Sequence, residues 1–302
     1  MYDQAFADCA AILPREARTA LLSSVGDQNL CGEEIRLRAG RGISVQSGGV
    51  ERPVLLAGAP LPVSSQDLNT VLERATQSSY QSASEQLRRG FYTMRGGHRI
   101  GVSGSMSVRD GRAVAFRELS SLSIRVARSF PGIAGKLEDE LLNAGRFPST
   151  LILSPPGAGK TTLLRELLRV LSDRFSLRAA LADERGEVAA LWRGAPQLDV
   201  GCHTDVLDGC PKAEGMMLLL RSMNPQVLAA DEITAPEDVA AVSMAANCGV
   251  SVLATAHGGD LEELRRRPLY RSLLRQAVFQ RVILIQCEED GSRSYRMEGL
   301  SC

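Results

Sequence analysis

Residues 151–162 read LILSPPGAGKTT, and this stretch decides the fold. The first three residues are apolar and typical of a strand, and they run into a loop with glycines at positions 157 and 159. A run of residues typical of a helix begins at Lys160. A strand, a glycine-rich loop and a helix in this order form a phosphate-binding loop, whose backbone N–H groups converge on phosphate oxygens. The sequence therefore predicts a P-loop over residues 154–162.

The P-loop pattern GxxxxGK[ST] is met in its second half by Gly159, Lys160 and Thr161, while Ser154 stands in place of the first glycine. We expect the Lys160 ammonium to reach the β- and γ-phosphates of ATP, and the Thr161 hydroxyl to coordinate Mg²⁺. Gly157 and Gly159 keep the loop open enough for its N–H groups to approach phosphate. The residues predicted to bind ATP are Ser154, Pro155, Pro156, Gly157, Ala158, Gly159, Lys160, Thr161 and Thr162.

A second signal is independent of the P-loop. Residues 227–232 read VLAADE, four apolar residues followed by two acids. A buried strand that ends in carboxylates delivers them beside the phosphates of a P-loop ATPase. The sequence therefore predicts that Asp231 holds the hydration shell of Mg²⁺ and that Glu232 orients or deprotonates the attacking water.

Two other predicted strands also end in polar residues. Residues 181–187 read LADERGE, and Glu184 is a second candidate for activating water. Residues 255–257 read TAH, which places Thr255 and His257 where they can sense the γ-phosphate. The predicted catalytic residues are thus Lys160, Glu232 and Glu184. The choice between the two acids stays open at this point, with a preference for Glu232.

Beyond residue 130 the pattern alternates between strands and helices, which indicates an α/β domain with a mainly parallel sheet and helices on both faces. Gly249 is expected to end one of these helices. The predicted strands are residues 151–153, 178–183, 227–230 and 250–255, the predicted helices are 160–173, 216–223 and 236–249, and a final hairpin over 281–298 turns at Asp290 and Gly291.

Residues 1–130 have a different pattern, rich in short strands and glycine turns. We expect strands at 34–38 and 43–47, a helix that starts at Ser64, and a hairpin over 91–108 that turns at Gly96 and Gly97. The buried face of that helix is expected to hold Leu68, Val71, Leu72 and Ala75. Residues 120–128 are predicted to form an edge strand that links two domains, 1–130 (small, α/β) and 131–302.

Composition excludes some classes of protein. The 35 basic and 35 acidic residues give a formal net charge of zero, which argues against nucleic-acid binding through overall positive charge. Lys136, Lys160 and Lys212 are the lysines among those basic residues, so a lysine where chemistry requires one is informative. Seven cysteines without a CxxC pair suggest reduced thiols in a cytoplasmic protein, and Cys202, His203 and Cys210 do not have zinc-site spacing. We expect no transmembrane segment, because no apolar run is long enough.

These motifs together resemble the hexameric ATPases of type II and type IV secretion and of type IV pili. That family carries a Walker A loop, an acidic box, a Walker B strand and a histidine box in the order found here, in a RecA-like domain. Residues 220–225 (LRSMNP) and the pair Ile124 and Arg125 fit the same resemblance. It implies a homo-hexamer with ATP between subunits, in which arginines of one subunit complete the neighbouring site. The candidate arginines are Arg125, Arg185 and Arg221.

A narrower resemblance is to the stage III sporulation AA family. Residues 194–233, GAPQLDVGCHTDVLDGCPKAEGMMLLLRSMNPQVLAADEI, and residues 96–104, GGHRIGVSG, look like that family. The resemblance implies an ATPase of the mother-cell cytoplasm in endospore-forming bacteria, with peripheral attachment at the inner face of the membrane through a partner as the open alternative. It would energise the channel complex between mother cell and forespore, with an integral-membrane platform protein as partner.

The chain departs from these families at two places. Secretion ATPases often have glycine at the position of Asp231, and Cys202 and His203 stand where a proline and a basic residue are expected. An alternative function is a nucleic-acid-associated P-loop ATPase, although no dedicated nucleic-acid module is expected. A nucleotide switch that does not hydrolyse ATP is disfavoured by the intact set of Lys160, Thr161, Asp231 and Glu232. An ABC-type ATPase is disfavoured because no LSGGQ-like signature precedes Asp231.

Overall fold

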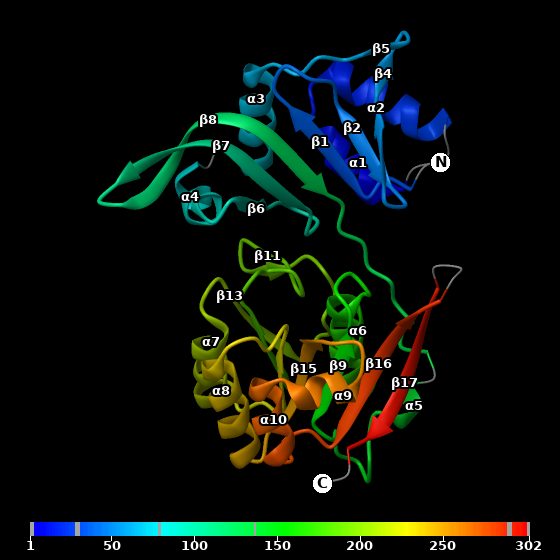
Figure 1. Cartoon of the computed structure of the whole chain (residues 1–302), viewed down its shortest axis with the longest axis vertical. Helices are drawn as coiled ribbons and strands as arrows, with labels where there is room; N and C mark the ends of the chain where they lie inside the picture. The colour runs from blue at the N-terminus through cyan, green and yellow to red at the C-terminus, as the bar shows by residue number, and fades with distance from the viewer. Residues whose placement is uncertain (1–2, 28–30, 78–79, 136, 289–291, 301–302) are drawn as a thin grey trace. The chain divides into compact units, whose positions relative to one another are not determined.

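A computed structural model describes residues 3–27, 31–77, 80–135, 137–288 and 292–300 of the chain. Its contacts divide the chain into two compact units, residues 1–128 (unit 1) and residues 129–302 (unit 2) (Figure 1). Each unit has a sheet and a hydrophobic core of its own. The predicted α/β fold class is confirmed in both units.

Unit 1 contains an antiparallel sheet with the strand order β3-β2-β1-β8-β7-β6. Helices pack against it and bury a shared apolar core. Its strands are β1 (Glu34–Arg38), β2 (Ser44–Ser47), β3 (Val50–Pro53), β6 (Phe91–Thr93), β7 (Arg99–Arg109) and β8 (Arg112–Arg125), with a small ribbon of β4 (Leu55–Leu56) and β5 (Ala59–Pro60). Its helices are α1 (Gln4–Ala11), α2 (Arg15–Asp27), α3 (Ser65–Thr76) and α4 (Tyr80–Arg88).

Helix α3 begins as the sequence predicts. The Ser64 hydroxyl accepts a hydrogen bond from the Asp67 N–H at 3.1 Å, and the Asp67 carboxylate accepts one from the Ser64 N–H at 2.8 Å. This reciprocal pair satisfies N–H groups that a helix start leaves without partners. The four apolar residues predicted for one face are all buried, namely Leu68, Val71, Leu72 and Ala75.

The prediction of an edge strand over residues 120–128 is wrong. Residues 120–125 form the last part of β8, which lies between β1 and β7, so the strand is hydrogen-bonded on both sides, and residues 126–128 follow its end. Ile124 of β8 is opposite Ile35 on one side and Ile100 on the other, and all three are buried. Asp110 and Gly111 connect β7 to β8 with φ of 51° and 73°, as the tightest hairpin turns require. The strand is therefore longer and more central than its apolar end alone indicated.

Gly104 of β7 lies directly against β8. A Cβ atom at this position would come within 2.0 Å of the Glu118 carbonyl oxygen, which is backbone and cannot rotate away. Replacing Gly104 with alanine is therefore expected to lower the free energy of unfolding of unit 1 by about 2 kcal/mol. Native-state hydrogen exchange of the β7 and β8 amides measures this change. Gly101→Ala is the matched control, because its added Cβ meets atoms at 3.7 Å or more; equal stability of the two variants would contradict the prediction.

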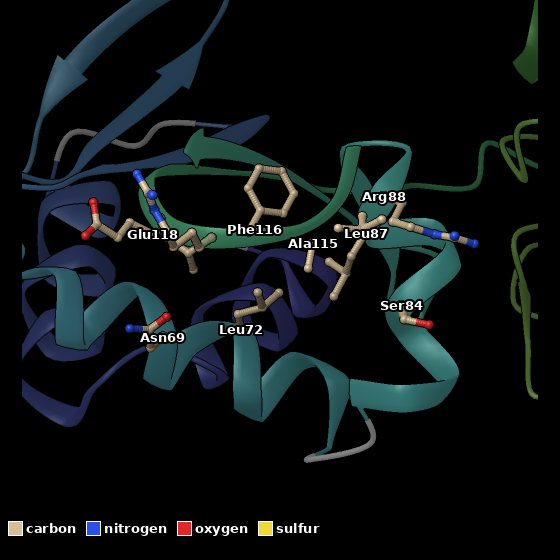
Figure 2. A pocket seen from close by; sticks show the side chains of 11 residues that line it. Asn69, Leu72, Ser84, Leu87, Arg88, Ala115, Phe116 and Glu118 are labelled. Carbon is tan, nitrogen blue, oxygen red and sulfur yellow. The ribbon is translucent and has the colours of Figure 1, made fainter. Parts of the chain in front are cut away.

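A hollow in unit 1 lies between α3, α4 and β8 (Figure 2). Leu72, Leu87 and Phe116 give it an apolar lining, and Arg88 and Glu118 add charged groups. All of its lining residues belong to unit 1. The predicted P-loop belongs to unit 2 and contributes nothing to this hollow.

Unit 2 contains a sheet with the strand order β13-β10-β14-β15-β9-β16-β17. Neighbouring strands are parallel except β16 and β17, which form the predicted antiparallel hairpin. The predicted turn of that hairpin at Asp290 and Gly291 lies outside the described residues. The sheet strands are β9 (Thr150–Ser154), β10 (Ala179–Asp183), β13 (Thr204–Asp208), β14 (Val227–Ala230), β15 (Ser251–His257), β16 (Arg281–Cys287) and β17 (Arg293–Gly299).

Helices cover both faces of the unit 2 sheet, which explains why its central strands are mostly apolar and are buried at nearly every position. In β9, Leu151 and Leu153 pack into the core beneath α7, α8 and α10, while Ile152 packs into the core beneath α6. The helices are α5 (Leu137–Glu140), α6 (Lys160–Asp173), α7 (Lys212–Ser222), α8 (Pro236–Asn247), α9 (Leu261–Arg266) and α10 (Pro268–Arg275), and β11 (Leu191–Trp192) pairs with β12 (Ala195–Pro196).

Candidate active site

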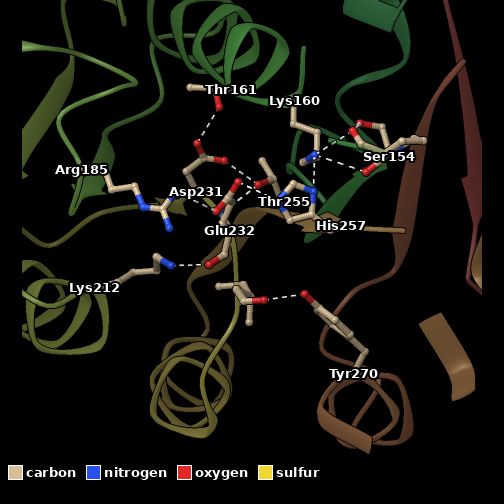
Figure 3. Close-up of polar contacts among 12 residues, drawn as sticks. Ser154, Lys160, Thr161, Arg185, Lys212, Asp231, Glu232, Thr255, His257 and Tyr270 are labelled. Atoms are coloured by element: carbon tan, nitrogen blue, oxygen red, sulfur yellow. Dashed lines mark hydrogen bonds and ion pairs between the residues drawn. The ribbon is translucent and has the colours of Figure 1, made fainter. Parts of the chain in front are cut away.

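The carboxyl ends of β9, β14 and β15 lie side by side at one edge of the unit 2 sheet. Strand β15 pairs in parallel with β9, so that His257 is opposite Ser154. It also pairs in parallel with β14, so that Ala254 is opposite Ala230. Asp231, which follows Ala230, therefore falls beside Thr255. This register brings three predicted motifs that are distant in sequence into one cluster (Figure 3).

The loop between β9 and α6 has a backbone suited to anions. Gly157 and Gly159 have φ of 76° and 101°, in the left-handed region that favours glycine. Gly159 is the N-cap of α6, and no side chain caps the helix there. The first N–H groups of α6 are therefore available to a ligand, and the helix dipole favours negative charge at the same point. A phosphate group fits this loop.

Lys160, the first residue of α6, is buried, with 5% of its surface exposed. Its ammonium donates to the carbonyl oxygens of Ser154 at 3.2 Å and Pro155 at 3.1 Å. It also lies 2.8 Å from Nδ1 of His257. Because an ammonium only donates, Nδ1 accepts and the ring proton sits on Nε2. Burial lowers the pKa of Lys160 from its ordinary value.

Asp231 is held by two hydroxyl groups. Thr161 donates to its Oδ2 at 2.7 Å, and Thr255 donates to its Oδ1 at 2.5 Å. The Thr255 oxygen in turn accepts the backbone N–H of Glu232 at 2.8 Å. A carboxylate beside a P-loop threonine supplies the hard oxygen atoms that Mg²⁺ prefers. The residues present therefore fit the predicted magnesium site.

Glu232 has an unusual backbone, with φ of 49° in the left-handed region. Its carboxylate lies between two partners, Nε2 of His257 at 2.8 Å and the guanidinium of Arg185 at 3.3 Å. Its carbonyl oxygen accepts a hydrogen bond from the ammonium of Lys212. A strained backbone conformation persists only where surrounding contacts enforce it, and such residues cluster at functional sites. The several partners of Glu232 fit this description.

Asp183 and Glu184, at the end of β10, have different environments. Asp183 is 2% exposed and accepts hydrogen bonds from the backbone N–H groups of residues 187–189, which fixes the loop that follows. Burial raises the pKa of its carboxyl, although those three amides act in the opposite direction. The side chain of Glu184 is 43% exposed and lies 3.8 Å from the Lys212 ammonium. Glu232, and not Glu184, contacts the histidine that also contacts Lys160.

The candidate arginines lie in three different environments. Arg125 pairs with Glu34 at 3.3 Å within unit 1. Arg185 pairs with Glu232 of its own chain, and its side chain is 63% exposed. Arg221 is exposed near the end of α7. Their action across a subunit boundary remains a prediction.

Cys202 and His203, the departure noted in the sequence, lie at the far end of α6 from the P-loop. The Cys202 N–H donates to Asp173 at 2.8 Å, and the His203 N–H donates to the Ser172 hydroxyl at 2.7 Å. Both partners belong to the last turn of α6, whereas Lys160 begins it. Within the chain, this pair therefore contacts the end of a helix and not the phosphate-binding loop.

Two contacts at the site were not predicted from the sequence. Lys212 reaches the Glu232 peptide from the first turn of α7. The scarcity of lysine in this arginine-rich chain was the available signal for it. Arg293, at the start of β17, donates from Nε to the Ala158 carbonyl of the P-loop at 2.8 Å. No pattern near Arg293 indicated this contact, because it depends on β16 pairing with β9 and on β17 pairing with β16.

Comparisons with known proteins agree with this architecture. The family model described as "Sporulation stage III, protein AA" matches residues 7–298. The stage III sporulation protein AA of Bacillus subtilis (strain 168) is 38% identical over 280 residues, which cover 91% of this chain and 89% of that protein.

Solved structures of low sequence identity share the fold. The ATPase DotB of Legionella pneumophila superposes with a TM-score of 0.59 at 18% identity, covering 92% of this chain and 78% of that one. The pilus retraction motor PilT, solved with ADP, superposes with a TM-score of 0.62 at 16% identity, covering 93% of this chain and 82% of that one. These similarities confirm the predicted fold, an α/β chain with a RecA-like domain.

In the described part of the chain, no helix is long and apolar enough to cross a membrane.

The family match spans both units, and the B. subtilis relative aligns over nearly the whole of each chain. Both observations agree with the resemblance that residues 96–104 and 194–233 carry. The chain therefore belongs to the family of stage III sporulation AA proteins.

Proposed function

We propose that this protein binds ATP with Mg²⁺ and hydrolyses it as a subunit of a homo-hexameric motor of the secretion-ATPase type. The observation that carries the proposal is the assembly of one cluster from three separate motifs. Lys160 and Thr161 of the P-loop contact His257 and Asp231, and His257 in turn contacts Glu232. These are the residue types that ATP hydrolysis requires, placed at the carboxyl edge of a parallel sheet.

Each residue of the cluster has a distinct part in the proposed reaction. The open N–H groups at the start of α6 and the Lys160 ammonium bind the phosphates of the substrate. Mg²⁺, when bound through Thr161 and Asp231, would neutralise charge on the phosphate oxygens. Glu232 orients the attacking water and accepts its proton. His257 links Lys160 to Glu232, so it is placed to report whether a phosphate has displaced the contacts seen here.

Assembly into a motor is supported by the relatives and by exposed arginines. PilT is described as a retraction motor and DotB as an ATPase, and both share the fold of this chain. Arg185 and Arg221 are exposed, which leaves them accessible to a second copy. The family and its B. subtilis member carry sporulation in their names. We infer that the motor acts in the mother-cell cytoplasm and energises the channel complex through an integral-membrane platform protein.

The test is ATP hydrolysis by the purified full chain as a function of protein concentration, with and without Mg²⁺. Specific activity is expected to rise as the chain assembles and to disappear when EDTA removes the metal. Absence of Mg²⁺-dependent hydrolysis at every concentration would sink the proposal. Activity that stays constant down to a demonstrated monomer would remove the intersubunit site and leave a monomeric ATPase.

A further inference from the structure

Lys212 is a buried lysine close to the candidate active site. It is the first residue of α7, and 6% of its surface is exposed. Burying an ammonium is unfavourable unless partners surround it. Most basic residues of this chain are arginines, so a lysine at a buried position beside the candidate site stands out.

The Lys212 ammonium joins three segments. It donates to the carbonyl oxygen of Glu232, in the loop that follows β14. It lies 3.8 Å from a carboxylate oxygen of Glu184, after β10, and 3.6 Å from one of Asp238, in the first turn of α8. That same Asp238 oxygen accepts the N–H groups of Thr234 at 2.9 Å and Ala235 at 3.1 Å. Lys212 is therefore anchored to the loop that leads away from Glu232.

The contact with Glu232 matters because of the backbone there. A left-handed conformation at a residue other than glycine is strained and persists only when its surroundings enforce it. On one side of the residue, its N–H donates to Thr255. On the other side, its carbonyl oxygen accepts from Lys212 (Figure 3). With both peptide groups held, the carboxylate is aimed at His257 and Arg185.

We propose that Lys212 is a positioning residue for ATP hydrolysis, which fixes the peptide of Glu232 and so aims the Glu232 carboxylate. This inference rests on the proposed function. It predicts an effect on turnover and not on binding, because the polar contacts of Lys212 among the described residues are with Glu232, Glu184 and Asp238 and not with the P-loop. If Lys212 were purely structural, its replacement would instead lower the stability of the fold. The accompanying loss of kcat would then be the same whichever residue occupies position 232.

The experiment is a double-mutant cycle between Lys212→Met and Glu232→Gln in the full chain. Lys212→Met alone is expected to lower kcat about 30-fold, with KM and the affinity for ATP changed less than about threefold. In the Glu232→Gln background the same substitution is expected to lower kcat less than about threefold, because there is no carboxylate left to aim. Arg169→Met is the matched control, since it removes a half-buried cation from α6 that pairs with Glu166.

Lys212→Arg tests the donor itself. Arginine keeps a cation and N–H donors for the Glu232 carbonyl, and it is expected to retain kcat within about fivefold of wild type. If Lys212→Met does not fold, the cycle is run with Lys212→Arg. Any loss of kcat that Lys212→Arg causes in the wild-type background must then be absent in the Glu232→Gln background. Hydrogen exchange at the Glu232 amide is expected to accelerate in Lys212→Met.

Equal losses of kcat in both backgrounds would overturn the inference, and so would a wild-type kcat in Lys212→Met. Either result leaves the proposed function intact. If Glu232→Gln hydrolyses ATP as fast as the wild type, the proposed role of Glu232 fails, and the role of Lys212 fails with it. The Glu232 single variant therefore separates the two failures.

Discussion

Replacing Glu232 with glutamine is expected to lower the turnover of ATP about 100-fold or more, while the affinity for ATP changes less than about threefold. Glutamine has nearly the same size and keeps contacts with His257 and Arg185 within reach. It cannot accept a proton from water, which is the step assigned to the carboxylate. The loss therefore falls on kcat, because the side-chain contacts of Glu232 among the described residues are with His257 and Arg185 and not with the loop predicted to hold the phosphates.

Steady-state hydrolysis and titration with a fluorescent ATP analogue measure the two effects separately. Glu184→Gln is the matched control, since it makes the same chemical change on the neighbouring strand end. Its side chain is 43% exposed and lies against Lys212 rather than His257, so a loss of less than about fivefold is expected. A larger loss in Glu184→Gln than in Glu232→Gln would transfer the activation of water to Glu184.

Replacing Lys160 with alanine is expected to weaken ATP binding about 100-fold and to abolish measurable hydrolysis. The buried ammonium is held at the mouth of the P-loop by the carbonyl oxygens of Ser154 and Pro155 and by His257. Alanine removes the charge that faces the phosphates and leaves His257 without its donor. The N–H groups of the loop remain, so some affinity for phosphate is expected to persist.

Equilibrium titration with the same fluorescent analogue measures this loss. Arg174→Ala is the control, because it removes an exposed cation just after α6 that pairs with Glu138 and Asp139. It is expected to bind ATP like the wild type. If Lys160→Ala kept its affinity for ATP and its rate of hydrolysis, residues 154–162 would not be the nucleotide site.

The two variants separate binding from turnover, although one histidine joins the two residues. His257 accepts from Lys160 through Nδ1 and donates to Glu232 through Nε2. A ligand that draws Lys160 away from His257 would change the environment of the Glu232 carboxylate. This arrangement shows how His257 could transmit the presence of a phosphate from Lys160 to Glu232. The role of His257 as a phosphate sensor remains a prediction.

Much of unit 2 was predictable because its signals are local. The apolar runs at residues 151–153 and 227–230 lie in β9 and β14, and the mostly apolar residues 250–255 overlap β15. The helix predicted over residues 160–173 is confirmed as α6. Helix α8 ends at Asn247 with Cys248 as its C-cap, and Gly249, the next residue, has φ of 77°, as expected for a glycine that ends a helix.

Predictions were weaker where an element depends on its neighbours. Helix α7 begins at Lys212, whereas the apolar pattern predicted a start at Met216, because its first turn is held by polar contacts. Strand β8 was assigned to an edge because its alternating pattern shows which residues are apolar but not how many partners the strand has. Its place between β1 and β7 depends on pairings across distant parts of the chain.

The sequence by itself determined the P-loop, the acidic strand ends and the family, because each is written in consecutive residues with fixed spacing. Tertiary structure alone decided which side chains meet. Asp231 lies between Thr161 and Thr255 because β15 separates β14 from β9. Lys212 reaches Glu232 because α7 packs against β14. Spacing along the chain reports local backbone geometry, whereas the direction of a side chain toward a distant partner is set by strand order, register and packing.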